Sequence, residues 1–232
     1  LGRICPAPCE KECRRAEVDS AVAIRDLKRF AADQVDLSEL PLPEIEDRPE
    51  KIAVIGSGPA GLTVAYYMRL KGYAVTIFEA LDQAGGMLRV GIPDYRLPPE
   101  ILDSEINFIL KHGIEIRTGV RFGSDLSLEG LRQDGFAAIF LGIGAHDAIR
   151  MNIPGEEQAE GVIDALAFLR AVNLGKGEVP GKQVIVIGGG NVAIDAARVA
   201  KRQGAEKVTV VYRRSEREMP AYPEELQGAR EE

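Results

Sequence analysis

Apolar residues along this chain gather in short blocks that read alternately as strands and helices. The blocks 51–55 (KIAVI) and 74–79 (AVTIFE) are short apolar runs, as in buried strands, and the pattern over 60–71 predicts a helix between them. Together they form a strand, helix and strand unit of about 30 residues. The same order returns near the end of the chain, with strands over 183–187 and 207–212 and a helix over 191–202.

The stretch between these two units adds further elements. The residues 81–100 are expected to form a loop. A helix around 101–112, strands over 114–118 and 137–145 and a helical stretch over 164–173 follow it. Strands that alternate with helices predict an α/β fold with a mostly parallel sheet and helices on both faces.

The residues before position 51 have a different pattern. Asp19 or Ser20 can cap a helix with one apolar face, which should pack on another part of the protein. The residues of that face are Ala23, Leu27, Phe30 and Ala31. The stretch 36–50 is acidic and contains three prolines, so it is predicted to be a connector.

Composition narrows the class of function. The 232 residues carry a formal net charge of −7, which disfavours a general affinity for nucleic acid or for anionic membranes. No apolar run reaches the roughly 20 residues that span a bilayer, and the start lacks the apolar core of a signal peptide. We therefore expect a cytoplasmic protein with no nucleic-acid or membrane partner. Because the chain starts at Leu1 with cysteines close behind, we also expect it to be an excised piece of a longer protein.

A glycine-rich turn joins the first strand to the first helix. Gly56, Gly58 and Gly61 form the pattern G-x-G-x-x-G. In this pattern the first glycine permits a tight turn, the second lets the backbone approach a pyrophosphate, and the third lets helix and strand pack closely. Glu79, at the end of the second strand, has the spacing of about 20 residues expected of an acid that binds a ribose diol. A dinucleotide site is favoured over a turn that only packs.

The second unit repeats this turn. Gly188 and Gly190 occupy the first two glycine positions, and Ala193 occupies the third, where alanine is an accepted variant. The two turns therefore predict two nucleotides in one chain, and the glycine spacing does not say which of them is a flavin.

The charge at the end of the second strand differs between the units. Alignment of the two strands places Tyr212 opposite Glu79, and Arg213 and Arg214 follow directly. A carboxylate would repel a 2′-phosphate, whereas guanidinium groups bind one through forked, charge-assisted hydrogen bonds. The second unit is therefore predicted to prefer NADP(H) to NAD(H). The alternative is that the arginines belong to an ordinary solvated loop.

Several stretches, in the same order over nearly the whole chain, resemble one family. They include GRICPAPCEKEC, VIGSGPAGLTVAYYMRLKGYAVTIFEA, GGMLRVGIPDYRLP, VIVIGGGNVAIDAARVAKRQGA and VTVVYRRSEREMPA. The chain resembles the small (beta) subunit family of NADPH-dependent glutamate synthase, a branch of the two-dinucleotide flavoproteins. The resemblance implies four parts: the end of a helical iron-sulfur domain over 1–35, a linker over 36–50, a first Rossmann-like FAD unit over 51–150 and an incomplete Rossmann-like NADPH unit over 151–232.

The resemblance also implies which residues hold each cofactor. The implied FAD contacts are Gly56, Gly58, Pro59, Ala60, Gly61, Glu79, Gly86, Leu88, Val120, Gly144 and Ala145. The implied NADPH contacts are Gly188, Gly190, Asn191, Val192, Arg213, Arg214 and Glu225, with the arginines on the 2′-phosphate and Glu225 towards the nicotinamide. In this family the chain returns after the nicotinamide unit to complete the flavin site, and the present sequence lacks that return.

Every cysteine lies near the start of the sequence. Cys5, Cys9 and Cys13 recur at every fourth residue, so a turn or short helix could place the three thiolates on one side. An iron-sulfur cluster or a zinc site usually needs four ligands, and a disulfide is disfavoured in a reducing compartment. The resemblance implies that these cysteines ligate 4Fe-4S clusters together with an upstream group of cysteines. We expect the site to be incomplete in this chain.

The resulting hypothesis is an enzyme that passes electrons from NADPH through FAD to iron-sulfur clusters or to a partner, such as a glutamate synthase large subunit. Flavin disulfide chemistry is excluded because no cysteine pair follows Cys13. The cofactors carry the chemistry, so neither His112 nor His146 is expected to be catalytic. Two alternatives stay open: a non-catalytic cofactor-binding or electron-transfer subunit, and a truncated chain without cofactor.

Overall fold

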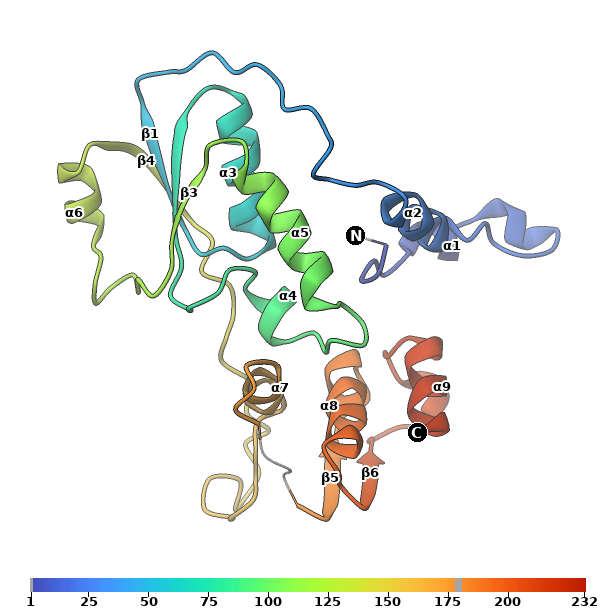
Figure 1. Ribbon diagram of the computed structural model, residues 1–232. Coiled ribbons are helices and arrows are strands. Elements are labelled where there is room, and N and C mark those ends of the chain that lie inside the picture. The colour runs from blue at the N-terminus through green and yellow to red at the C-terminus, as the bar shows by residue number, and fades with distance from the viewer. Residues whose placement is uncertain (1, 178–180) are drawn as a thin grey trace.

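The computed structural model describes residues 2–177 and 181–232 and contains two parallel sheets (Figure 1). The first sheet has the strand order β3-β2-β1-β4, and the second pairs β5 with β6. The strands are β1 (Lys51–Ile55), β2 (Ala74–Phe78), β3 (Glu115–Arg117), β4 (Phe136–Leu141), β5 (Gln183–Ile187) and β6 (Lys207–Val211). Every strand pair is parallel, which confirms the α/β class.

Helices connect these strands in sequence order. The α-helices are α1 (Pro8–Lys11), α2 (Ile24–Asp33), α3 (Pro59–Leu70), α4 (Met87–Val90), α5 (Pro99–Leu110), α6 (Leu128–Gln133), α7 (Ala165–Asn173), α8 (Asn191–Arg202) and α9 (Pro223–Glu231). Two short 3-10 helices are η1 (Arg14–Glu17) and η2 (Glu216–Glu218). The sequence pattern missed α4 and α6, which are only four and six residues long.

The first sheet is covered on both faces. In β1, Ile52 and Val54 point into a core that α3 and α5 cover, whereas Ala53 and Ile55 point to the opposite face, where Leu131 of α6 packs. Figure 1 shows α3 and α5 on one side of the sheet and α6 on the other. Burial on both faces explains why the strands are continuous apolar runs, because each buried aliphatic side chain contributes about 2 kcal/mol.

The strand predicted over 137–145 is shorter than expected. It ends at Leu141, and the backbone N–H of Gly142 then donates to the carbonyl of Ile55 at 2.7 Å. β1 ends at this same Ile55, so residues beyond Gly142 have no strand to pair with. The GIGA segment is therefore a loop at the carboxyl end of the sheet.

The second sheet is covered on one face only within the described residues. Alternate side chains of β5 and β6 are half-buried on the side of α8, and the other side exposes Ile185, Ile187 and Val211. Ile185 is 68% exposed. Helix α8 in turn packs against α7 and α9.

The helix predicted near the N-terminus forms, but its start and its packing differ from the prediction. It begins after Ala23, and neither Asp19 nor Ser20 caps it, because the Asp19 carboxylate instead pairs with Arg15. None of its residues is buried, and Phe30 is 66% exposed. The segment touches the first unit through Ile4, which is partly buried and packs against the core on the α3 and α5 side of the sheet.

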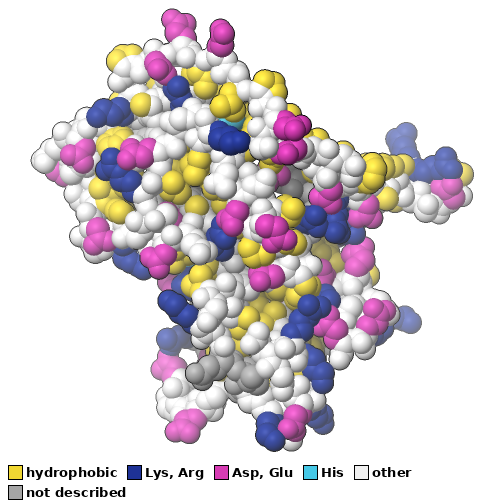
Figure 2. All heavy atoms as spheres, viewed as in Figure 1, with side chains coloured by type: hydrophobic (Ala, Val, Ile, Leu, Met, Phe, Trp, Pro, Cys, Tyr) yellow, Lys and Arg dark blue, Asp and Glu magenta, His cyan; other side chains and the backbone are white. Residues whose placement is uncertain are grey.

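The surface gives no sign of a single-sign charge patch on the viewed face. Figure 2 shows basic and acidic side chains interspersed over that face. Among residues 2–177 and 181–232, no helix combines the length and the apolar character that crossing a membrane requires.

Candidate functional site

The first glycine turn lies between β1 and α3, at the carboxyl edge of the sheet. Gly56 has φ +97°, and a Cβ there would lie 2.4 Å from the carbonyl oxygen of Gly142. A Cβ on Gly61 would lie 1.9 Å from the carbonyl oxygen of Gly56. At Gly58 the nearest atom is Cα of Gly86, 4.0 Å away. Glycine is thus required by packing at two positions, whereas the third leaves its backbone open to a ligand.

Glu79 follows β2 and is held against this turn. Its Oε2 accepts hydrogen bonds from the backbone N–H of Ser57 at 2.8 Å and from Ser57 Oγ at 2.5 Å, and its Oε1 accepts one from the N–H of Leu81 at 2.8 Å. The residue is only 6% exposed. Because a carboxylate offers about four acceptor positions, these three bonds orient Glu79 and leave about one for a ribose hydroxyl.

The other predicted flavin contacts lie around the same turn. The N–H of Val120 donates to the carbonyl of Glu79 at 2.9 Å, and Leu88 is in α4, directly after Gly86 and Met87. The carboxyl ends of β1, β2 and β4 meet here. β1 lies between β2 and β4, so the strand order changes direction at β1. Open parallel sheets bind ligands at such a switch point. Exposed positions around the turn are Pro59 and Ala60, which open α3, and Gly144 and Ala145, which follow β4.

The second glycine turn, between β5 and α8, is open. Gly188 has φ +142°, and around Gly190 no atom of the described residues lies within 4 Å of a Cβ position. Val192, in the first turn of α8, is exposed. The side chain of Asn191 accepts a hydrogen bond from the N–H of Tyr222 at 2.9 Å, so the segment before α9 closes over one side of the turn. Free backbone N–H groups at the start of α8 point to an anion site.

The two turns differ at the third glycine position for a visible reason. In the second turn, a Cβ on Gly188 would lie 3.2 Å from the methyl group of Ala193. In the first turn, the close approach of Gly61 to the backbone of Gly56 leaves no room for a methyl group. Only the second turn therefore accommodates alanine at this position.

The predicted 2′-phosphate residues follow β6 directly. Arg213 and Arg214 are exposed, and neither forms an ion pair with any residue in the described ranges 2–177 and 181–232. The loop that carries them is fixed at its far end, because Ser215 and Glu218 form a reciprocal capping box around η2. Two guanidinium groups thus stand next to the open turn on a short, anchored loop.

Tyr212 fixes the near end of that loop. Its ring packs on the second glycine turn so closely that a Cβ on Gly189 would lie 2.7 Å from the ring, and its hydroxyl donates to the carbonyl of Glu218 at 3.2 Å. The position that holds an acid in the first unit thus holds a neutral packing residue in the second.

A cluster of buried charges that the sequence analysis missed joins the two units. Tyr95 and Arg96 come from the loop between α4 and α5, and both bind Asp195 of α8, at 3.1 and 2.6 Å. Arg96 also forms an ion pair with Glu225 of α9, with 3.1 Å between its Nε and Oε1 of Glu225. The Nε–H group does not point at that oxygen, so it makes no hydrogen bond. Glu225 pairs in addition with Arg198 at 2.6 Å. Glu225, predicted to face the nicotinamide, is thus engaged by two arginines.

Burial raises the pKa of two members of this cluster, Asp195 and Tyr95. Loss of water raises the pKa of the Asp195 carboxyl, and the positive charge of Arg96 opposes that rise. Burial and the neighbouring Asp195 raise the pKa of Tyr95, so its hydroxyl stays protonated and donates to Asp195.

The three cysteines do not converge. Cys9 lies in α1, whereas Cys5 precedes this helix and Cys13 follows it, and within the described part of the chain no three Cys, His, Asp or Glu side chains are grouped to hold a metal ion. The N–H of Ala7 and the ammonium of Lys28 lower the pKa of Cys5, and backbone N–H groups of Val22 and Arg15 lower that of Cys13. These shifts raise the fraction of thiolate, the form that ligates metal, at Cys5 and Cys13, but the three cysteines make an incomplete ligand set.

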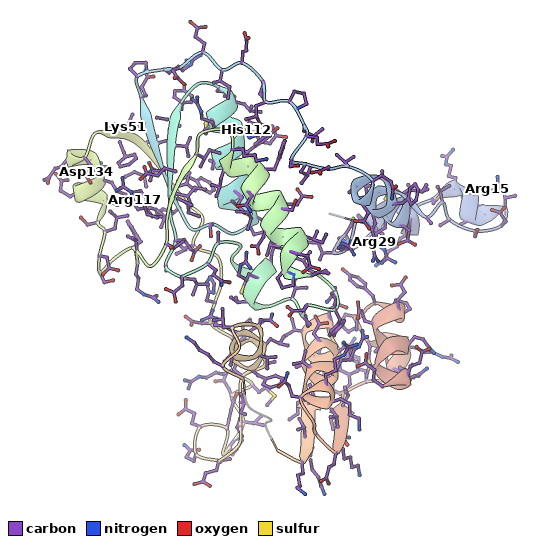
Figure 3. The ribbon with its side chains drawn as sticks, viewed as in Figure 1. Arg15, Arg29, Lys51, His112, Arg117 and Asp134 are labelled. Atoms are coloured by element: carbon purple, nitrogen blue, oxygen red, sulfur yellow. The ribbon has the colours of Figure 1, made fainter. Side chains whose placement is uncertain are left out.

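The two histidines have local partners. His112 lies where α3 and α5 approach each other (Figure 3) and packs edge-on against Tyr66 and Phe108, with ring centroids 5.0 and 5.1 Å away. His146 lies after β4, where its Nδ1 is 2.5 Å from Arg170 of α7. The structure therefore gives His112 a packing role and His146 a pairing role.

Residues 50–232, which contain both glycine turns, match the model of the pyridine nucleotide-disulphide oxidoreductases. The chain belongs to this family. Relatives within it extend over the cysteine segment as well. The NADPH-Fe(3+) oxidoreductase subunit beta of Geobacter sulfurreducens is 46% identical over 100% of this chain and 35% of its own length. The glutamate synthase [NADPH] small chain of Escherichia coli is 35% identical over 100% of this chain and 52% of its own.

A solved structure supports the same fold. FprA, an oxidoreductase of Mycobacterium tuberculosis whose atomic-resolution structure revealed a covalent modification of NADP+, is 26% identical, with a TM-score of 0.66. The match covers 79% of this chain and 48% of FprA. The chain thus spans between about a third and about half of the length of these relatives.

Proposed function

We propose that the intact protein that contains this chain oxidises NADPH and passes the electrons through FAD to an acceptor on a partner subunit. The observation that carries the proposal is the opposite charge beside two similar glycine turns. Glu79 is buried and fixed at the first turn, whereas Arg213 and Arg214 are exposed at the second. An acid suits a ribose that has free hydroxyls, and a pair of arginines suits one that carries a 2′-phosphate.

The residues at each turn fit the cofactor assigned to it. At the first turn, Gly58 would let the pyrophosphate of FAD approach the start of α3, and Glu79 would hold the ribose. At the second, Gly190 and Asn191 would hold the pyrophosphate of NADPH and the two arginines its 2′-phosphate. A bound FAD supplies the chemistry, because it accepts a hydride and can release electrons singly. The residues of this chain would bind the two cofactors and orient them.

The names of the relatives support a partner and an iron acceptor. The Geobacter relative is a subunit beta and the Escherichia relative is a small chain, and each name implies a further subunit. We propose that the present protein also works with an electron-accepting subunit. Cys5, Cys9 and Cys13 fit as part of a 4Fe-4S ligand set completed by residues elsewhere in the intact protein.

The experiment is an anaerobic titration of the intact protein, reconstituted with excess FAD. NADPH should bleach the flavin absorbance, and an artificial acceptor should sustain NADPH oxidation. Iron and sulfide analysis of the same preparation, against a variant in which serine replaces the three cysteines, tests the cluster proposal. A protein that retains no flavin, or whose flavin NADPH leaves oxidised, would contradict the proposed function. Retained flavin without reduction would favour a non-catalytic cofactor-binding subunit.

Gly190→Ala should separate binding from folding. Gly190 has φ −89° and no neighbour within 4 Å of a Cβ, so we expect the free energy of unfolding to change by less than about 1 kcal/mol. The new methyl group would occupy the space through which the pyrophosphate passes, so NADPH affinity should fall by about tenfold or more. Calorimetric titration with NADP+ measures the affinity. An unchanged affinity would show that the pyrophosphate does not bind at this turn.

A further inference from the structure

The cluster of Tyr95, Arg96, Asp195, Arg198 and Glu225, hereafter the junction, is where the two units meet. The 92–98 loop of the first unit contributes Tyr95 and Arg96, and α8 and α9 of the second unit contribute the other three. The centre of the Tyr95 ring also lies near two cations, 4.3 Å from the guanidinium carbon of Arg198 and 4.1 Å from that of Arg202. One loop is therefore held by several side chains of α8, the helix that begins at the second glycine turn.

The charged residues at the junction need an explanation, because apolar contacts would hold the two units together with a larger gain in stability. The side chain of Arg96 is 12% exposed and that of Asp195 is 5% exposed. A buried ion pair of this kind contributes little net stability, since the loss of water offsets the attraction. It differs from an apolar contact in being directional. Two hydrogen bonds into one carboxylate fix the position of the loop, whereas aliphatic surfaces can slide past each other.

Each side of the junction leads directly to a glycine turn. Asp195 lies one helical turn after Asn191, the first residue of α8. On the other side, Gly86 lies against Gly58 of the first turn, because a Cβ on Gly86 would lie 2.8 Å from Cα of Gly58. Helix α4 follows Gly86 and leads into the loop that carries Arg96.

Helix α7 reinforces the same path. The side-chain amide of Asn173 donates to the carbonyl of Arg89 at 3.2 Å and to that of Ile92 at 2.9 Å. The segment from Gly86 to Arg96 is therefore tied to the first turn at one end, to α7 in the middle and to α8 at the other end. A shift of α8 would therefore move this segment and with it the residues at the first turn.

We propose that Asp195 is a positioning residue that sets the second unit against the first, so that a nicotinamide held at the second turn reaches the flavin held at the first. The inference rests on the proposed function and deepens it. Hydride transfer requires the two reacting atoms at near contact, and a misplacement of about 1 Å costs about 100-fold in rate. The predicted signature is slower flavin reduction with unchanged cofactor binding.

The test compares variants of the intact, FAD-loaded protein by anaerobic stopped flow with NADPH. Asp195→Asn should slow flavin reduction by about 100-fold and leave the dissociation constant of NADP+ within about twofold. The double variant Arg96→Met with Asp195→Leu removes both charges. Its thermal unfolding should match that of the wild type while its reduction stays slow, which separates position from stability.

Asp103→Asn is the matched control. Asp103 is a carboxylate paired with Arg89 of the same region, but both partners belong to the first unit, so this variant should reduce its flavin at the wild-type rate. Wild-type rates in the Asp195 variants, or a loss that lies entirely in NADP+ affinity, would overturn the positioning role alone. A wild-type protein whose flavin NADPH does not reduce would overturn the proposed function, and the positioning role with it.

Discussion

Replacing Gly61 with alanine is expected to destabilise the first unit by about 3 kcal/mol or more. The new Cβ would lie 1.9 Å from the carbonyl oxygen of Gly56 and 3.2 Å from Val54. The clashing atom belongs to the backbone of Gly56, between β1 and α3, so it cannot move aside as a flexible side chain could. The strand and helix must separate, and the flavin contacts that depend on their spacing should be lost with them. Urea unfolding of the intact protein, together with its flavin content, measures both effects.

Gly123→Ala provides the control for this prediction. Gly123 has φ +98°, but nothing lies within 4 Å of its Cβ position in the described residues. Alanine there should cost only about 1–2 kcal/mol of backbone strain and leave the flavin content unchanged. Equal stability of the Gly61 variant and the wild type would show that the close approach at the first turn does not exist.

Exchange of Arg213 and Arg214 for glutamine is expected to weaken NADPH binding by about 100-fold and NADH binding hardly at all. Each guanidinium group can make a charge-assisted hydrogen bond to the 2′-phosphate, and two such bonds at an exposed site contribute about 3 kcal/mol together. Neither arginine has a carboxylate partner among the described residues, so the exchange breaks no ion pair within the chain. The ratio of kcat/KM for the two nucleotides measures the effect.

Arg217→Gln controls for the general loss of positive charge in the same loop. Arg217 is exposed and lies in η2, between the two capping-box residues Ser215 and Glu218. This variant should keep the wild-type preference for NADPH. An equal loss for NADPH and NADH in the double arginine variant would refute the phosphate role, and a similar change in preference in Arg217→Gln would show that only the overall charge matters.

The sequence predicted the strands well because each is a short, continuous apolar run, even in β5, where alternate side chains are exposed. The runs over 51–55 and 183–187 are the observed β1 and β5. Predictions failed where the choice between pairing partners decides the outcome. The strand that contains Leu141 ends there because β1 offers no further residue to pair with. The cap expected at Asp19 is absent because the helix begins only after Ala23, and the Asp19 carboxylate pairs with Arg15 instead.

The candidate site divides in the same way. The glycine spacing and Glu79 were predictable, because a turn and a strand end are local features. The role of Ser57 was not, because any residue can occupy that position in the motif, although here Ser57 holds the carboxylate of Glu79. Asp195 gave a partial signal, since it is an acid among the alanines on the buried face of α8. That pattern could not identify Arg96, its partner 99 residues away.

The bare side of β5 and β6 bears on the order in which the chain acquires its structure. Two paired strands are marginal in water and need a helix or further strands to persist. Here α8 supplies that support, and α8 is itself held by Tyr95 and Arg96. Within the described residues, the first sheet is covered on both faces without this contact. In this chain the second sheet is therefore expected to become stable only once the 92–98 loop of the first unit is in place.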